Sequence, residues 1–390
     1  MPPETFAFKP YLGQDFYVPA YKIRLGGREV PELHDITTVS YSDSLTAIDS
    51  FDVTVNNWDA ANQKFKYTDV ETFRPWTRVE LGLGYYRRGF DLRRPMLTGE
   101  ITTMAPTFPA SGGPTLAVRG LNLLHRFRLK QETKPFFLQT DTEIASFLVG
   151  RIDAELRKQF PQLRIELEPE KLSEEKIPFL VMQNQYPIVF LMERARRIGY
   201  ELAIKELPEG SQGRVLISFA PTSIISRPTY VLEWGVSLIS IQPTLRVAEQ
   251  VSKVTVRGWN PQSKKPIVKS VTRAQLKGER VVHPRDLDLQ EPPLAQEVTV
   301  DRPIGSEGEA ERYAKMILRQ TASELVVAKG RTIGLPDLRA GVKVQIRGLG
   351  RRFSGPDDRP FEYVVTETTH AFSDAGYTTD FTARMEASAS

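Results

Sequence analysis

The sequence lacks cysteine altogether, and only four of its 390 residues are histidine. Disulfide bonds, thiolate zinc sites, iron-sulfur clusters and cysteine nucleophiles are therefore excluded, and little histidine remains for metal binding or acid–base chemistry. The charge is nearly balanced as well, with 52 Lys and Arg residues against 48 Asp and Glu residues, so composition does not indicate nucleic-acid binding. These absences exclude many classes of enzyme.

The sequence also lacks a hydrophobic run long enough to cross a membrane. Its most apolar window, IPFLVMQNQYPIVFLM, is interrupted by Gln183, Asn184, Gln185 and Pro187 and falls short of the roughly 20 residues that a helical span needs. The start, MPPETFAFKP, has neither the cationic nor the apolar segment of a secretory signal. We therefore expect a soluble protein made in the cytoplasm, without membrane insertion.

The first part of the chain, from Tyr21 to about Arg119, consists of short segments in which apolar and polar residues alternate. In FDVTVNN, for example, Phe51, Val53 and Val55 point to one face, and the polar residues between them point to the other. Turn residues such as Gly112 separate these segments. This pattern predicts an antiparallel sheet.

The apolar spacing changes to about four residues near Thr140, which predicts a helix. Thr140 and Glu143 have the spacing of a capping box, and Pro161 marks the end of the pattern. A second helix is predicted from Pro187 to Ile198, with Gly199 as its C-terminal cap. Strand patterns in YELAIKEL and RVLISFA follow, so this part of the chain predicts a small α/β module.

Strand patterns return in SLISIQPTLRV and VSKVTVRGW and close the chain in VKVQIRG, FEYVVTETTHAF and YTTDFTARM. Between them, a charged segment with several prolines from about Pro261 to Pro293 predicts long loops or an exposed arm. Ser306 and Glu309 have capping-box spacing and begin an apolar helix pattern. We predict three domains: a β domain with an N-terminal extension at 1–128, an α/β insert at 129–228, and a second β domain at 229–390 with an arm at about 261–300 and an inserted helix at about 306–325.

Two segments in the outer domains resemble each other. VELGLGYYRRG and VQIRGLGRRFSG both run from an apolar strand into Gly-Leu-Gly and then into a basic or aromatic turn. A second strand and a glycine turn follow each segment at nearly the same distance, with Phe108 and Gly112 matching Phe372 and Gly376. The similarity predicts that one kind of β unit occurs twice, on either side of the insert. The alternative is a chance likeness between two hairpins with glycine turns.

The glycines of these two segments do not fit a phosphate-binding loop. Gly82 with Gly84, and Gly348 with Gly350, lack the dinucleotide spacing, lie between strands and are not followed by Lys-Ser or Lys-Thr. We predict structural turns at both places. The basic pairs beside them, 87–88 and 351–352, could touch a polyanion, but solvated hairpin tips are favoured.

His370 is the best candidate for a general base, oriented by Asp374 or Asp380. The alternation of the strand argues against this arrangement, because Asp374 falls in a turn and Asp380 falls on the return strand, and no serine or cysteine nucleophile is evident. A hydrogen-bonded strand histidine near the turn is favoured. We predict no catalytic residue, no cofactor and no metal.

The C-terminal sequence resembles the signature of the phage late control protein D family, which comprises the baseplate hub proteins of contractile phage tails and contractile injection systems. The likeness extends over roughly residues 20 to 385, and the insertion PDDRPFE after Gly355 departs from it. Gly82 and Gly84 are the corresponding positions in the first β domain. The residues that carry the C-terminal signature include Gly341, Gly348, Gly350, Gly355, Tyr363, His370, Phe372, Gly376, Tyr377 and Phe381.

The resemblance implies a mainly β fold in which two tail-tube-like antiparallel β-barrels flank a small α/β domain. It implies a non-enzymatic homotrimer that adapts the sixfold tail tube, or a tube-initiator protein, to a threefold spike. Other baseplate subunits would be further partners, and no specific nucleic acid is expected. Because the chain ends at Ser390, soon after the signature, we expect the trimeric spike to be a separate protein. The particle would be a virion tail or an extracellular or cell-anchored injection device.

Two other functions remain open from the sequence. A tail-associated cell-wall hydrolase would need a cleft with two suitably spaced carboxylates, and the 48 acidic residues offer many candidate pairs. A carbohydrate- or nucleic-acid-binding β module would rest on the basic loops alone.

Overall fold

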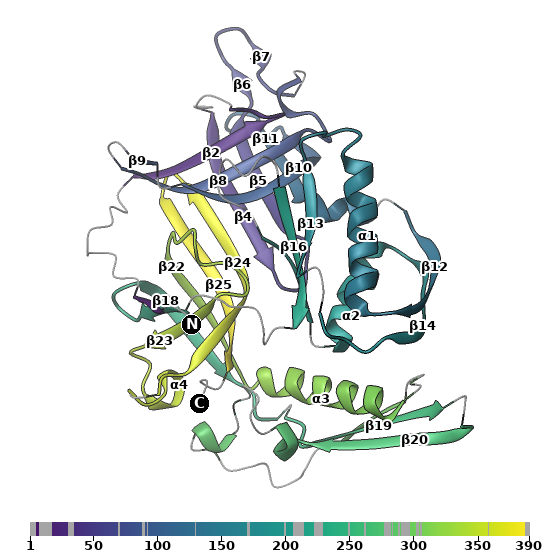
Figure 1. The fold of residues 1–390 in the computed structure, drawn as a ribbon. Helices are drawn as coiled ribbons and strands as arrows, with labels where there is room; N and C mark the ends of the chain where they lie inside the picture. The colour runs from purple at the N-terminus through teal and green to yellow at the C-terminus, as the bar shows by residue number, and fades with distance from the viewer. Residues whose placement is uncertain are drawn as a thin grey trace.

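The computed structural model describes residues 5–7, 18–29, 35–68, 71–87, 90–91, 93–128, 130–169, 172–198, 200–205, 214–221, 229–248, 250–260, 263–276, 282, 284–287, 289, 297–301, 304, 306–357 and 359–386. The fold is mainly β, as predicted, and two β units flank an α/β insert (Figure 1). Two residues named in the sequence-based predictions, Gly199 and Arg88, lie outside the described residues. So do most of the N-terminal twenty residues and much of the predicted arm.

The first β unit is a strongly curled sheet, in which β2 and β8 run across β4 and β5 (Figure 1). Apolar residues at every second position of its strands face a common core, which includes Tyr41, Leu81 and Met96. Its strands are β2 (Pro19–Leu25), β3 (Arg28–Glu29), β4 (Ile36–Ser44), β5 (Ser50–Asn56), β8 (Arg78–Arg87), β9 (Phe90–Asp91), β10 (Arg94–Thr107) and β11 (Thr115–Asn122). A small hairpin, β6 (Trp58–Asp59) and β7 (Lys64–Phe65), and the turn η1 (Glu71–Phe73) complete it.

The second β unit has its own apolar core, which includes Leu338, Val344 and Tyr363. Its strands are β17 (Thr229–Glu233), β18 (Leu238–Leu245), β22 (Val326–Ile333), β23 (Lys343–Arg347), β24 (Glu362–Ser373) and β25 (Gly376–Glu386). The short helix α4 (Arg351–Ser354) lies between β23 and β24, and β1 (Thr5–Ala7) pairs with β17.

The two β units share one strand order. When the six main strands of each unit are numbered along the chain, both sheets run second, third, sixth, fifth, fourth, first. The first unit reads β4-β5-β11-β10-β8-β2, and the second reads β18-β22-β25-β24-β23-β17. Only the last strand differs in direction, because β2 is antiparallel to β8 whereas β17 is parallel to β23.

Irregularities in strand register also recur at matching places. The second strand of each unit has a shift near its start, between Ile36 and Thr38 in β4 and between Leu238 and Ser240 in β18. The fifth strand has a shift near its middle, between residues 101 and 103 in β10 and between residues 365 and 367 in β24. Because such bulges re-aim a strand at one defined residue, shared bulges indicate a duplicated fold and not a general likeness of antiparallel sheets.

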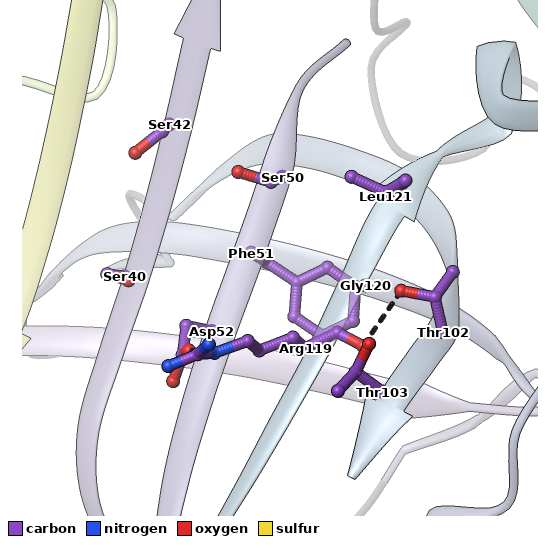
Figure 2. Close-up of a pocket in the computed structure, with 10 residues that line it drawn as sticks. All are labelled: Ser40, Ser42, Ser50, Phe51, Asp52, Thr102, Thr103, Arg119, Gly120 and Leu121. Atoms are coloured by element: carbon purple, nitrogen blue, oxygen red, sulfur yellow. Dashed lines mark hydrogen bonds and ion pairs between the residues drawn. The ribbon is translucent and has the colours of Figure 1, made fainter. Parts of the chain in front are cut away.

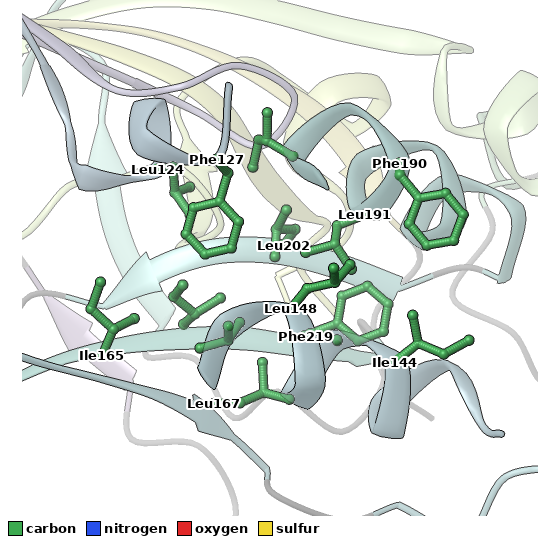
Figure 3. Packing of buried hydrophobic residues seen from close by; sticks show 14 of the residues in the cluster. Leu124, Phe127, Ile144, Leu148, Ile165, Leu167, Phe190, Leu191, Leu202 and Phe219 are labelled. Atoms are coloured by element: carbon green, nitrogen blue, oxygen red, sulfur yellow. The ribbon is translucent and has the colours of Figure 1, made fainter. Parts of the chain in front are cut away.

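The α/β insert has a separate core between two helices and a small sheet (Figure 3). Helix α1 (Asp141–Leu156) begins at the predicted capping box, in which Thr140 and Glu143 bond to each other's backbone, and α2 (Pro187–Ile198) has the predicted bounds. Leu148, Leu191 and Phe219 meet between them. The other elements are η2 (Leu123–Arg128), β12 (Glu132–Gln139), β13 (Arg164–Glu168), β14 (Ile177–Gln185), β15 (Tyr200–Lys205) and β16 (Arg214–Pro221).

A small α/β layer is inserted between β18 and β22. The helix α3 (Glu307–Ser323) begins at Ser306, which accepts a hydrogen bond from the Glu309 backbone, and packs on the strands β19 (Lys253–Asn260), β20 (Lys265–Thr272) and β21 (Glu297–Asp301). The turns η3 (Arg273–Leu276) and η4 (Pro284–Leu287) follow β20. The prediction of loops from about Pro261 is therefore wrong for β20. Proline and charge hid its alternation there, since Ile267 and Val271 are buried against α3.

Candidate functional site

The two β units are joined by a strand ladder within the chain. One edge of strand β24 pairs first with β23 and then, over Glu367–Ser373, with Ser44–Thr38 of β4. The hydroxyls of Thr369 and Ser42 lie 3.0 Å apart across this ladder. We call it the within-chain joint. It makes the sheets of both units one continuous surface.

A buried carboxylate, Asp43, anchors the joint from the core side. It accepts hydrogen bonds from Arg339 at 2.7 Å, from the backbone N–H of Ala340 at 3.1 Å, and from the Thr368 hydroxyl. Arg339 also donates to the Met96 carbonyl at 2.9 Å and lies over the Tyr41 ring. Although burial opposes the charge of Arg339, Tyr41 and Asp43 raise its pKa above the ordinary value. The ion pair therefore ties the two units together electrostatically.

His370 lies fully buried beside this ion pair and is not paired with either predicted aspartate. Its Nδ1 lies 2.9 Å from the Tyr377 hydroxyl and 3.1 Å from the Thr379 hydroxyl, and its Nε2 lies 3.0 Å from the Leu338 carbonyl oxygen. Burial lowers the pKa of His370 to about 4, so the ring is neutral near pH 7. Asp380 instead binds Arg331 on the exposed face, at 2.6 Å.

The signature residues of the C-terminal part cluster around turns and the second core. Gly341, Gly348, Gly350, Gly355 and Gly376 all have positive φ, which side chains with a Cβ rarely adopt. Tyr363, Tyr377 and Phe381 are buried, and the Tyr363 hydroxyl donates to the Phe353 carbonyl oxygen at 2.6 Å. Phe372 packs edge-on against Tyr21 of the first unit.

The turn predicted at Gly82 and Gly84 is wrong, because both residues lie inside β8. Gly82 is constrained by its neighbours: a Cβ there would lie 3.3 Å from the Arg94 carbonyl oxygen. The local sequence could not distinguish a turn from a close approach of two strand backbones, since glycine is favoured at both. Arg351 and Arg352 lie in α4 and are not the tip of a plain hairpin.

The joint carries a continuous exposed face of short polar side chains, which we call the polar sheet face. Neighbouring strands bring these residues into rows across both units, because period-two alternation keeps one set on the outer side. One row runs through Ser240, Arg331, Asp380, Thr369, Ser42 and Ser50. The next runs through Thr378, Ala371, Ser40, Asp52, Arg119 and Thr103.

Charged side chains on this face are paired with each other. Asp52 and Arg119 lie opposite one another and form an ion pair over a shallow depression of about 400 Å³ (Figure 2). Arg331 and Asp380 form the corresponding kind of pair in the second unit. Serine and threonine side chains from neighbouring strands line the depression around the first pair (Figure 2). The charged side chains that line the depression, Asp52 and Arg119, compensate each other, so its surface is polar and carries no net charge.

Sequence analysis missed Asp43 and Arg339. A signal for Asp43 was present, since it continues the apolar phase of Val39 and Tyr41 in β4 and so falls on the core side. A carboxylate at such a position needs a partner, but the sequence did not identify Arg339, which lies almost 300 residues away. Among the described residues, no group of three or more acidic or histidine side chains is placed to hold a metal ion. In the same part of the chain, no helix has the length and apolar character needed to cross a membrane.

The fold is that of known tail proteins. A 43 kDa tail protein of prophage MuSo2 from Shewanella oneidensis superposes with a TM-score of 0.66 at 14% identity, covering 94% of this chain and 98% of that one. A tail protein from Neisseria meningitidis gives 0.63 at 13% identity, covering 94% and 97%. The Escherichia coli c3393 protein, a component of the type VI secretion system, gives 0.55 at 14% identity, covering 93% and 76%.

Sequence comparison places the chain in a protein family. Among curated proteins, none matches its sequence. The family model described as the Alg8 N-terminal domain matches residues 17–358, which is most of the chain and includes the whole first β unit, the whole insert and part of the second β unit. The chain therefore belongs to the Alg8 N-terminal domain family.

Proposed function

We propose that the chain is the structural hub of the baseplate in a contractile phage tail or contractile injection system. Three copies form a ring that presents six similar β units to a hexameric tail tube, or to a tube-initiator protein, and a threefold face to a separate trimeric spike. The observation that carries this proposal is the duplicated β unit, with its shared strand order and matching bulges.

The duplication is useful because it reconciles two symmetries. A closed ring of three chains repeats every third of a turn, whereas a hexameric partner repeats every sixth of a turn. When each chain carries the binding unit twice, the ring offers six near-equivalent contacts on one face and keeps three identical contacts on the other. The rigid within-chain joint fixes the angle between the two units of a chain, which this arrangement requires.

The polar sheet face is our candidate for the lining of the central channel. It spans both units without interruption, and its exposed ion pairs, Asp52 with Arg119 and Arg331 with Asp380, neutralise each other. A passing polymer would therefore meet hydroxyl groups and no large region of one charge. Such a lining lets cargo slide, because no strong binding site holds it in place.

The finer assignments belong to the same proposal. Membership of the late control protein D family, contacts with other baseplate subunits, and assembly in the bacterial cytoplasm before release as part of a particle follow from the sequence resemblance. The domain limits at 128 and 228 follow from the changes in apolar spacing along the chain. The hub has no catalytic role. Support for this last point is that the structural neighbours are tail proteins and that His370 is buried and occupied by hydrogen bonds.

The proposal is tested by measuring the mass of the purified chain in solution, alone and with the hexameric tube protein of the same particle. We expect a species of three chains that binds one tube hexamer. Isolated chain should not clear peptidoglycan, which separates the hub from the hydrolase alternative. A monomer that binds neither tube nor spike protein would contradict the proposal.

A further inference from the structure

Strand β24 changes partners at one residue within the joint. Val365 still belongs to the β23 side, since its N–H donates to the Val342 carbonyl at 2.9 Å and its carbonyl accepts from Gly341 at 2.6 Å. The next residue, Thr366, already accepts from Leu45, at 3.0 Å, just beyond the end of β4. The bulge at this point lets one edge of β24 serve two strands.

The equivalent strand of the first unit, β10, repeats the first half of this arrangement. Its start pairs with β8, and Ile101 exchanges hydrogen bonds with Trp76 and Thr77 at 2.8 and 3.0 Å, as Val365 does with the residues before β23. The bulge follows at the same place. From Thr102 to Thr107, however, β10 pairs with β11 on one side, and no other strand of the described chain pairs with its second edge.

The second unit has the complementary open edge. Strand β18 is the counterpart of β4, which pairs with β5 on one side and with β24 on the other. Within the described residues, β18 pairs only with β22, apart from one isolated bridge between Leu238 and Trp234. Within each chain, the edges of β24 and β4 are paired with each other. The corresponding edges of β10 and β18 are not paired with each other.

We propose that β10 of one copy pairs with β18 of the next copy, in the antiparallel register of the within-chain joint. This inference rests on the proposed ring, which it completes by making all six joints alike in geometry. The register follows when β10 is matched to β24, and β18 to β4, at their bulges, and the pairing of β24 with β4 is then copied. In this register Thr103 would lie opposite Arg246, Ala105 opposite Thr244, and Thr107 opposite Gln242. The polar sheet face would then continue around the whole ring.

The core-side residues of the two open edges support this pairing. Met104, Pro106 and Phe108 form an apolar row on one edge, and in the inferred register they face Leu245, Pro243 and Ile241. Pro106 and Phe108 are exposed in the single chain, Phe108 by 59%, whereas Thr368 and His370, which hold the positions of Met104 and Pro106 in the within-chain joint, are 2% and 0% exposed. An exposed apolar row of this kind indicates a surface that is covered on assembly.

The prolines distinguish the joint between copies from the joint within the chain. By the equivalence, Pro106 and Pro243 take the places of His370 and Tyr41, which pair directly across the within-chain joint. Proline has no N–H to donate and is tolerated on strand edges, where it discourages pairing with unrelated strands. The ladder between copies is therefore interrupted at one rung and relies more on the apolar row, so the ring assembles from chains that remain separable.

The test is a disulfide cross-link in the full chain, which has no cysteine of its own. The double variant Ala105→Cys with Thr244→Cys places thiols at a non-hydrogen-bonded pair, where opposite Cα atoms lie about 4.5 Å apart and a disulfide can form. Oxidation should give a covalent ring of three chains on a denaturing gel without reductant. Each single-cysteine variant should stay at the mass of one chain.

Two further variants serve as matched controls. Ser42→Cys with Thr369→Cys is the equivalent pair of the within-chain joint, and it should cross-link without any increase in mass. Ala105→Cys with Ser240→Cys is out of register by four residues and should not cross-link. If the chain forms trimers but only the within-chain pair cross-links, the strand pairing is wrong and the proposed ring survives. If no trimer forms, alone or with tube protein, the proposed function fails and this inference fails with it.

A second measurement avoids engineered thiols. Phe108→Asp changes an exposed residue whose ring contacts that of Phe65, which is itself exposed, so the thermal unfolding temperature of the monomer should fall only slightly. Self-association should weaken at least about tenfold, because burying an aromatic side chain contributes roughly that much or more to binding. Val268→Asp, at a residue 60% exposed on β20, is the control and should leave association unchanged. Equal effects of both variants would overturn the pairing.

Discussion

At the scale of single residues, the polar groups buried at the within-chain joint have a structural explanation. Asp43 is surrounded by donors from the second unit, and His370 is held by two hydroxyls and a carbonyl. Buried polar groups cost free energy unless they are hydrogen-bonded, so the network is stable only when the two units are docked in one geometry. Asp43 thus specifies how the two units fit together, whereas His370 has its three hydrogen-bond partners within the second unit.

The protonation of His370 should make stability depend on pH. Its pKa is about 4 in the native chain and 6.5 for an unperturbed histidine, so between these values the unfolded chain binds a proton that the native chain does not. The contribution is full above pH 6.5 and is lost as the pH falls toward 4, by roughly 3 kcal/mol. Denaturant unfolding of the wild type and of His370→Gln, at pH 7 and near pH 4, measures it.

The variant is the internal control for all other titrating groups. His370→Gln should be less stable than the wild type at neutral pH, but its stability should fall less on acidification. Parallel curves of stability against pH for the two proteins would show that His370 has the same pKa in the folded and the unfolded state.

At the scale of elements, close backbone packing explains glycines that turn prediction cannot. Gly120 of β11 lies opposite Phe51, and Gly330 of β22 lies opposite Phe381, so in both units an aromatic ring covers a strand glycine. A side chain at Gly120 would collide with the Phe51 ring and with the Glu100 carbonyl oxygen. The glycine lets the ring lie flat on the strand and fill the core.

Gly120→Ala should therefore be destabilising. Overpacking of this kind costs about 1–3 kcal/mol of unfolding free energy, since backbone and ring must both shift. Gly113→Ala is the matched control, because its Cβ would meet nothing closer than 3.8 Å, at the Asn56 side chain, and we expect a change within about 0.5 kcal/mol. Shifts in the urea midpoint report both. An equally small effect of the two changes would contradict this prediction. It would mean that the backbone of β11 and the Phe51 ring can shift at little cost in free energy.

At the scale of the whole molecule, our proposal makes the two open strand edges the sites through which the chain assembles. An unpaired edge is a site at which any extended chain can add, and natural proteins limit this risk with prolines or by covering the edge. Here β10 and β18 carry prolines at positions that lie opposite each other in the inferred register, with apolar residues beside them. These edges are therefore guarded in the monomer and, in our proposal, covered in the ring.

The same argument predicts how the ring responds to salt. Contacts between apolar rows are not screened, whereas exposed ion pairs weaken when the Debye length falls to about 3 Å near 1 M salt. The fraction of trimer in solution should stay constant or rise between low salt and about 1 M NaCl. Sedimentation measures it directly. Dissociation of the trimer at high salt would indicate that charged loops, and not the strand edges, hold the copies together.

The sequence by itself determined the local structure and the existence of the repeat. Alternation predicted strands such as β5, the Thr140 capping box predicted the start of α1, and the similarity around Phe108 and Phe372 predicted a repeated β unit. These features depend on neighbours within a few residues or on comparison of two such segments. The mainly β class followed from them.

Only the tertiary structure decided which edges meet. The pairing of β24 with β4, the partnership of Asp43 with Arg339, and the placement of Gly82 inside a strand all involve residues far apart in the chain or backbones in close approach. A strand's own pattern states which face is buried but not which strand lies beside it, because backbone hydrogen bonds are the same for every sequence. Side chains therefore determine which face of a strand is buried, whereas the packing of the whole chain determines which strand lies beside it.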